Sequence, residues 1–113
     1  MTTSRLTAGS AAAEIYGMFL SVYEAARSFR QGDTREGTVR INQIEETLSD
    51  SKKQYRYLGI HTHFHVDPRP WTKSLRTLVA KVKSKDLGPA EVEEQIQPFL
   101  TEIDSHLPLV PHF

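Results

Sequence analysis

Three histidines occupy alternate positions within five residues, and an aspartate follows them: His61, His63, His65 and Asp67. Imidazole nitrogens and carboxylate oxygens are ordinary ligands of divalent transition metals. In an extended chain, side chains two residues apart leave the same face, so a His-x-His pair can close on one ion. In a helix, His61 and His65 would share a face instead. These four residues are therefore a candidate metal site.

The metal hypothesis competes with two others, because the sequence offers only two well-placed ligands in either geometry. A third and fourth would have to come from Asp67, His106, His112, water or a second chain. The interpretation we favour is a connector in which Phe64 and Val66 close the end of a helical bundle while the imidazoles face water. A third interpretation is a pH sensor, in which neighbouring imidazoles charge near about pH 6 and repel one another.

The segment GIHTHFHVDP, residues 59–68, resembles the start of metal-dependent hydrolases, in which His-x-His follows a strand. Its HFHVDP part resembles the His-x-His-x-Asp-His signature of metallo-β-lactamase-like enzymes, with Pro68 in place of the final histidine. The resemblance implies a large sheet-based scaffold. The remaining sequence predicts helices, so no catalytic residue is carried over from either family.

Apolar residues recur at spacings of three and four in four segments, a pattern that is typical of amphipathic helices. Asp33 precedes Glu36 by three residues and has the form of a helix cap, while Gly32 and Gly88 can end helices. Pro98 falls inside the last segment and should kink it, because proline lacks an amide hydrogen. We expect helices over residues 10–30, 34–58, 70–87 and 89–107.

Short connectors between amphipathic helices favour antiparallel neighbours, so we predict an all-α fold, an up-down-up-down four-helix bundle. The fourth helix is expected to be kinked, and the His-rich connector between the second and third helices is expected to be extended. One domain should span residues 1–113, since this length suits a single core. Residues 1–9 are expected to lack order, and residues 108–113 to form an extended tail. Two chains completing one bundle is the alternative.

Composition excludes several classes of protein. Fourteen basic residues balance fourteen acidic ones, so no overall field would gather nucleic acid or an anionic membrane. The absence of cysteine excludes disulfides and thiolate catalysis. The sequence shows neither a secretory signal nor an apolar run of membrane-spanning length, so we expect an intracellular protein without a membrane partner.

Positive charge is concentrated between residues 69 and 85, where six lysines and arginines occur without an acid. Against a phosphate-binding role stand the neutral chain and the lack of interleaved aromatic residues for base stacking. The last predicted helix carries five acids and no base, so we expect the two charge runs either to pair across their hairpin or to form solvated faces. A candidate anion or nucleic-acid site remains on one helix face: Arg69, Lys73, Arg76 and Lys83.

Catalytic motifs are missing from the sequence, including Gly-x-Ser-x-Gly, phosphate-binding glycine loops and dinucleotide fingerprints. These absences favour a non-catalytic protein without a cofactor. The alternative is a metal-binding protein or metalloenzyme in which His61, His63 and His65 hold a divalent transition metal. The favoured function is a small non-catalytic interaction module, such as an adaptor, assembly factor or subunit, that binds a protein partner or a second copy. Large apolar side chains near the connector and in the C-terminal tail are the expected contacts: Phe64, Trp71, Leu109, Val110 and Phe113.

Overall fold

All regular structure in the described part of the chain is helical, which confirms the predicted all-α class. The computed structural model describes residues 5–106, so the predicted tail contacts Leu109, Val110 and Phe113, and also His112, lie outside the described residues. Six helices follow one another: α1 (Arg5–Arg30), α2 (Thr34–Ser49), α3 (Ser51–Tyr57), α4 (Gly59–Phe64), α5 (Arg69–Lys83) and α6 (Pro89–Asp104). None of them is both long and apolar enough to cross a bilayer.

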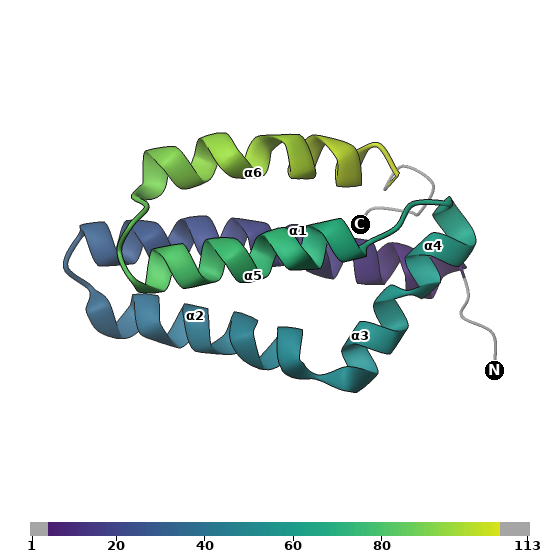
Figure 1. Cartoon of the computed structure of the whole chain (residues 1–113), viewed down its shortest axis with the longest axis horizontal. Helices are drawn as coiled ribbons and strands as arrows, with labels where there is room; N and C mark the ends of the chain where they lie inside the picture. The colour runs from purple at the N-terminus through teal and green to yellow at the C-terminus, as the bar shows by residue number, and fades with distance from the viewer. Residues whose placement is uncertain (1–4, 107–113) are drawn as a thin grey trace.

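The long helix α1 is the centre of the molecule, and α2, α5 and α6 pack along it (Figure 1). It begins at Arg5, so residues 5–9, expected to lack order, are helical. Its N-terminal half is rich in alanine, and the small side chains of Ala8, Ala11 and Ala12 are fully buried. Small residues on one helix face let neighbouring elements approach closely, and this explains how α3 and α4 fit against the same end of α1.

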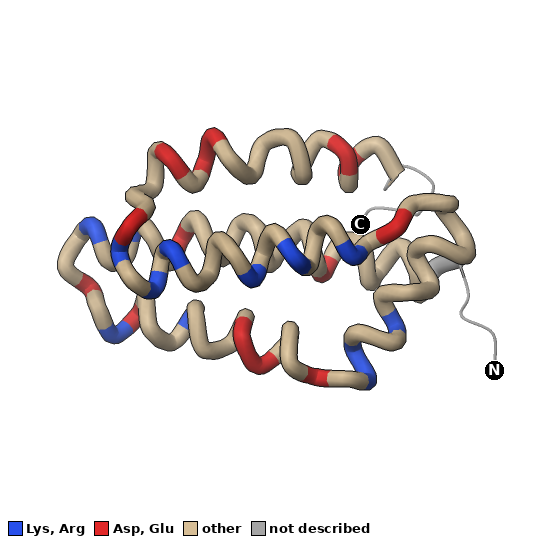
Figure 2. The backbone as a smooth tube through the Cα atoms, viewed as in Figure 1, with Lys and Arg blue, Asp and Glu red and all other residues tan. Residues whose placement is uncertain are grey.

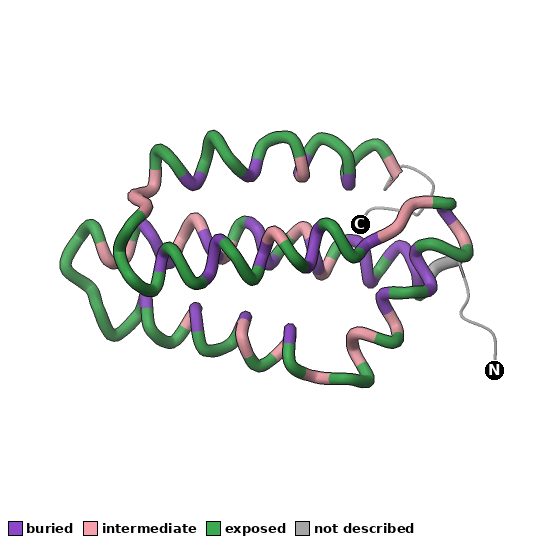
Figure 3. The backbone as a smooth tube through the Cα atoms, in the orientation of Figure 1, coloured by how far each residue is buried: buried purple, intermediate pink, exposed green. Residues whose placement is uncertain are grey.

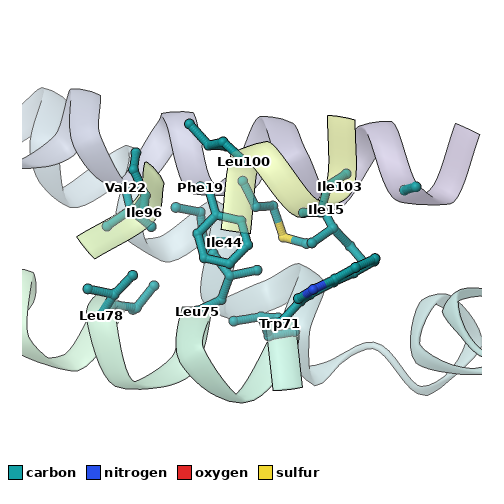
Figure 4. Packing of buried hydrophobic residues seen from close by; sticks show 14 of the residues in the cluster. Ile15, Phe19, Val22, Ile44, Trp71, Leu75, Leu78, Ile96, Leu100 and Ile103 are labelled. Atoms are coloured by element: carbon teal, nitrogen blue, oxygen red, sulfur yellow. The ribbon is translucent and has the colours of Figure 1, made fainter. Parts of the chain in front are cut away.

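A single core fills the space between the four long helices (Figures 3 and 4). Phe19 of α1 is fully buried, and its ring stacks on Phe99 of α6 with centroids 5.1 Å apart. Trp71 and Leu75 bring the inner face of α5 into the same cluster. Burying each such side chain contributes roughly 1.5–3 kcal/mol, so the apolar stripes dominate stability.

The second predicted helix was wrong in its length, because Asp50 divides it. Asp50 has an extended backbone, with φ −80° and ψ 111°, and its carboxylate accepts hydrogen bonds from the amides of Lys52 (2.9 Å) and Lys53 (3.3 Å). These bonds satisfy the first amides of a new helix, α3. The apolar stripe runs on across the break, and periodicity alone therefore did not reveal it.

The prediction of an extended His-rich connector was also wrong, because Gly59–Phe64 forms α4. Ile60 and Phe64 are four residues apart, and both are buried against the core. Helical backbone places this pair on one face. An extended backbone would instead have turned Thr62 to the same side. The helix ends at Phe64. His65 follows it with a left-handed backbone (φ 57°), and its amide donates the last helical hydrogen bond to the His61 carbonyl at 2.9 Å.

The start and stop residues predicted for the last two helices agree with the structure. Pro70 lies in the first turn of α5, and α6 begins at Pro89 after Gly88. Glu91 supports that start, because its side chain accepts a hydrogen bond from the Gly88 amide at 3.1 Å. Pro98 lies inside α6 without ending it.

Candidate functional site

The structure does not gather the three histidines around a common point. His61 and His65 are exposed, and His63 is half-buried on the short helix between them. His106, one of the further ligands considered, lies beside the Phe64 ring, with centroids 6.0 Å apart. Among residues 5–106, no group of three or more His, Cys, Asp or Glu side chains is arranged to hold a metal ion. The metal site therefore stays a prediction that this geometry does not support.

Asp67 is engaged at the start of α5 instead. Its carboxylate accepts bonds from the Arg69 amide (2.9 Å), from Nε (3.0 Å) and from Nη2 (2.7 Å). These side-chain hydrogen bonds from Arg69 are the main reason that the pKa of Asp67 falls to about 2. A metal at Asp67 would have to compete with this ion pair.

Most of the predicted anion-binding strip on α5 is also occupied. Arg69 pairs with Asp67, Arg76 donates to the Leu48 carbonyl at the end of α2 (3.1 Å), and Lys83 pairs with Glu45 of α2 (3.3 Å). Lys73 alone of the four makes no ion pair or hydrogen bond within the described range through its ammonium group.

Of the two alternatives for the charge runs, the structure does not show the pairing across the hairpin. No ion pair joins α5 to α6 in the part of the chain that the structure describes. Figure 2 shows the basic residues along α5 and the acidic residues at the two ends of α6. Lys83 pairs with Glu45 of α2 instead. The rotation of α5 about its own axis determines which neighbouring helix its side chains face. The sequence does not state that rotation.

Two of the predicted partner contacts are core residues. Phe64 is 7% exposed and Trp71 is 1% exposed, so both belong to the apolar cluster. Both are large apolar side chains of the kind found at partner contacts, but here they pack in the core of their own chain. The large apolar side chains at the surface are different ones, of which Tyr55 and Leu58 on the short helices are the most exposed, at 77% and 48%.

Tyr55 and Leu58 border a groove of about 670 Å³ between the α3–α4 corner and the first half of α5. One wall is apolar and the other carries Arg69, Lys73 and Arg76. The volume falls within the range of about 300–1,000 Å³ that is typical of ligand sites, enough for a few side chains. We call it the α3–α5 groove, and its lining comprises Gln54, Tyr55, Tyr57, Leu58, Pro68, Arg69, Thr72, Lys73 and Arg76.

A partly buried polar cluster holds α3 against α1 and so holds one wall of the groove in place. The hydroxyl of Tyr57 donates to Glu14 Oε1 at 2.8 Å, and Arg56 pairs with the other Glu14 oxygen. Lys53 approaches the same carboxylate at 3.8 Å. Burial of Tyr57 raises the pKa of its hydroxyl, partly opposed by the nearby Arg56 charge. With the inner side of α3 held in this way, Tyr55 is directed outward.

Sequence reasoning missed both the groove and this cluster. One signal was present, because Glu14 is the single charged residue between residues 6 and 23, in the otherwise apolar and small-residue face of the first helix. A lone carboxylate beside a buried stripe needs a partner. No pattern in the sequence identifies α3 as the element that supplies this partner.

The polar groups of the α3–α5 groove suit the binding of a ligand. Its lining contains no carboxylate or imidazole, and its polar groups are an amide, hydroxyls and three cationic side chains. An apolar floor with cations along one wall would hold an amphipathic ligand that carries negative charge. The chain matches no protein-family model, no curated protein and no solved structure, so its function is argued from this geometry.

Proposed function

We propose that the protein is a non-catalytic interaction module that binds a segment of a partner protein in the α3–α5 groove. The observation that carries the proposal is the exposure of Tyr55 (77%) and Leu58 (48%) beside this groove. Exposed large apolar side chains that lie together beside a concave surface are typical of contact sites. We take the four long helices to be the up-down-up-down scaffold, with a kink at Pro98, that holds the two walls in place.

The groove's charges favour an acidic partner segment. Arg76 donates to a neutral carbonyl, and Lys73 has no ion pair within residues 5–106, so both positive charges are uncompensated. Arg69 is neutralised by Asp67 and adds little. The partner segment should therefore place an apolar side chain between Tyr55 and Leu58 and a carboxylate toward Lys73 and Arg76.

The nucleic-acid alternative has less support. Long polyanions need several free phosphate-binding cations in a row. Two of the four residues in the predicted strip are already neutralised by ion pairs within the chain: Arg69 and Lys83. A short acidic peptide needs only the two uncompensated charges beside the apolar wall.

Fluorescence anisotropy with two labelled peptides tests the proposal. One peptide of about 12 residues carries leucine and tryptophan anchors flanked by glutamates, and the other has lysines in place of the glutamates. The acidic peptide should bind saturably and the lysine peptide should not. Leu58→Ser and Tyr55→Ala should each weaken binding about tenfold, as expected of central contact residues.

The matched control is Val39→Ser on α2, because Val39 is 44% exposed and lies outside the groove. It should bind the acidic peptide as the unchanged protein does. Equal binding of both peptides, or an acidic peptide that ignores Leu58→Ser and Tyr55→Ala, would overturn the proposal.

A further inference from the structure

A second groove, distinct from the first, runs between α5 and α6. Its volume is about 340 Å³, and it is lined by Lys73, Ser74, Thr77, Leu78, Gln95 and Phe99. Leu78 is 3% exposed and Phe99 is half-buried, so the floor is apolar. The rims are polar, and they differ in charge.

The rim on α5 is basic. Lys73 and Thr77 line the groove, and Lys81 continues the same row, because residues four apart share a helix face. The side chains of Lys73 and Lys81 form no ion pair within the described residues. Both are exposed.

The rim on α6 is acidic. Gln95 and Phe99 line the groove, and the row extends to Glu91 on one side and to Glu102 on the other. Glu102 is exposed and makes no ion pair in the described range, and Glu91 uses one oxygen to cap its own helix. One face of the molecule thus carries a positive row beside a negative row, and no ion pair joins the two rows among the residues that the structure describes.

We propose that this face binds a second copy of the same chain, forming a two-fold dimer. A two-fold axis along the groove, parallel to the helices, lays α5 of one copy over α6 of the other, and the reverse. Helices α5 and α6 are antiparallel (Figure 1), so counting residues from the hairpin puts Lys81 level with Glu91 and puts Lys73 within about one helical turn of the level of Glu102. Rotation about this axis leaves the position of each residue along the helices unchanged. It therefore brings Lys73 close to the partner's Glu102 and Lys81 close to the partner's Glu91.

The charge pattern selects this arrangement over the other two-fold packing of the same face. An axis across the helices would place α5 on α5 and α6 on α6, with like charges opposed. The contact relies on exposed ion pairs around a small apolar floor, so the dimer should be weak and sensitive to salt. The inference is separate from the α3–α5 groove, although Lys73 borders both.

Analytical ultracentrifugation of single charge reversals tests the dimer. Lys73→Glu and Glu102→Lys should each raise the dimer dissociation constant about tenfold, because each places like charges together at two symmetric positions. An equal mixture of the two variants should form heterodimers about as tightly as the unchanged protein forms homodimers, since each Lys–Glu pair is then restored. Raising NaCl from about 0.1 M to about 1 M shortens the Debye length from about 10 Å to about 3 Å and should favour monomers.

Glu93→Lys and Arg35→Glu are the matched controls, since both residues are exposed and neither belongs to a rim. They should leave the dissociation constant unchanged. Leu58→Ser should also leave it unchanged while weakening peptide binding, which keeps the two proposals distinguishable. A monomer at all concentrations in low salt, or variants that fail to complement each other in the mixture, would overturn the dimer.

Discussion

The hydroxyl of Tyr57 donates a hydrogen bond of 2.8 Å to Glu14, which precedes it by 43 residues. The same carboxylate pairs with Arg56, the neighbour of Tyr57 in the chain. One half-buried acid on α1 therefore receives two side chains from α3. This contact positions the short helix that presents Tyr55 and Leu58, so the stability of the cluster and the shape of the α3–α5 groove are linked.

Removing either end of this hydrogen bond should destabilise the protein, by different amounts. Tyr57→Phe deletes the donor and should cost about 1 kcal/mol, the usual net value of one hydrogen bond. Glu14→Ala should cost about 1–3 kcal/mol, because it leaves the buried Tyr57 hydroxyl without its acceptor. Urea denaturation measures both values. A Glu14→Ala variant as stable as the unchanged protein would show that this contact does not hold α3.

Ionisation of Tyr57 should lower the stability of the folded protein at alkaline pH. Burial raises its pKa above the ordinary 10.0 in the folded state. The stabilisation from the neutral hydroxyl is thus fully present below about pH 10 and is lost as the pH rises through the folded-state pKa. Absorbance at about 295 nm should show a tyrosine ionisation above about pH 10 that Tyr57→Phe removes. An alkaline titration curve that is the same above about pH 10 with and without Tyr57→Phe would contradict this expectation.

Protonation of Asp67 should lower the stability of the folded protein at acid pH. Hydrogen bonds from Arg69 hold its pKa at about 2, below the ordinary 3.8. Its contribution to stability is therefore present above about pH 4 and is lost as the pH falls toward 2. Thermal melting between about pH 5 and pH 2 should show the difference between the unchanged protein and Asp67→Asn shrinking with acidity. A difference that is constant over this range would mean that the carboxylate is not engaged with Arg69.

The cap at Asp50 should matter for both stability and binding. Asp50→Ala removes the acceptor for the amides of Lys52 and Lys53 and should cost about 0.5–2 kcal/mol. Because α3 forms one wall of the groove, binding of the acidic peptide should weaken in parallel. Asp33→Ala is the matched control, since Asp33 caps α2 through the Glu36 amide (3.1 Å) and lies outside the groove. It should lower stability by a similar amount and leave peptide binding unchanged. If the two variants weakened peptide binding equally, the start of α3 would have no particular role in shaping the groove.

Local signals in the sequence were sufficient for much of the fold. Gly32 ends α1 with a left-handed backbone (φ 83°), Asp33 caps α2, and Gly88 with Pro89 marks the start of α6. Each of these features depends on residues within a few positions of one another. Short-range steric and hydrogen-bonding rules therefore apply to them before the chain is folded.

The candidate sites were harder to predict, because they depend on relationships between distant segments. The alternation from Ile60 to Val66 is compatible with a strand, and the burial of Ile60 and Phe64 against α1 is what makes α4 a helix. The six basic residues between residues 69 and 85 can be read directly from the sequence. Only the structure shows that the Arg76 and Lys83 side chains contact α2.

Periodicity and caps determined that this chain folds into helices with apolar inner faces, because those signals are local. The tertiary structure decided that Trp71 and Phe64 are buried while Tyr55 and Leu58 are exposed. It also decided which charges are neutralised and which remain for a partner. These outcomes depend on the rotation and contacts of packed helices, and a one-dimensional pattern records the face of each helix without recording what that face meets.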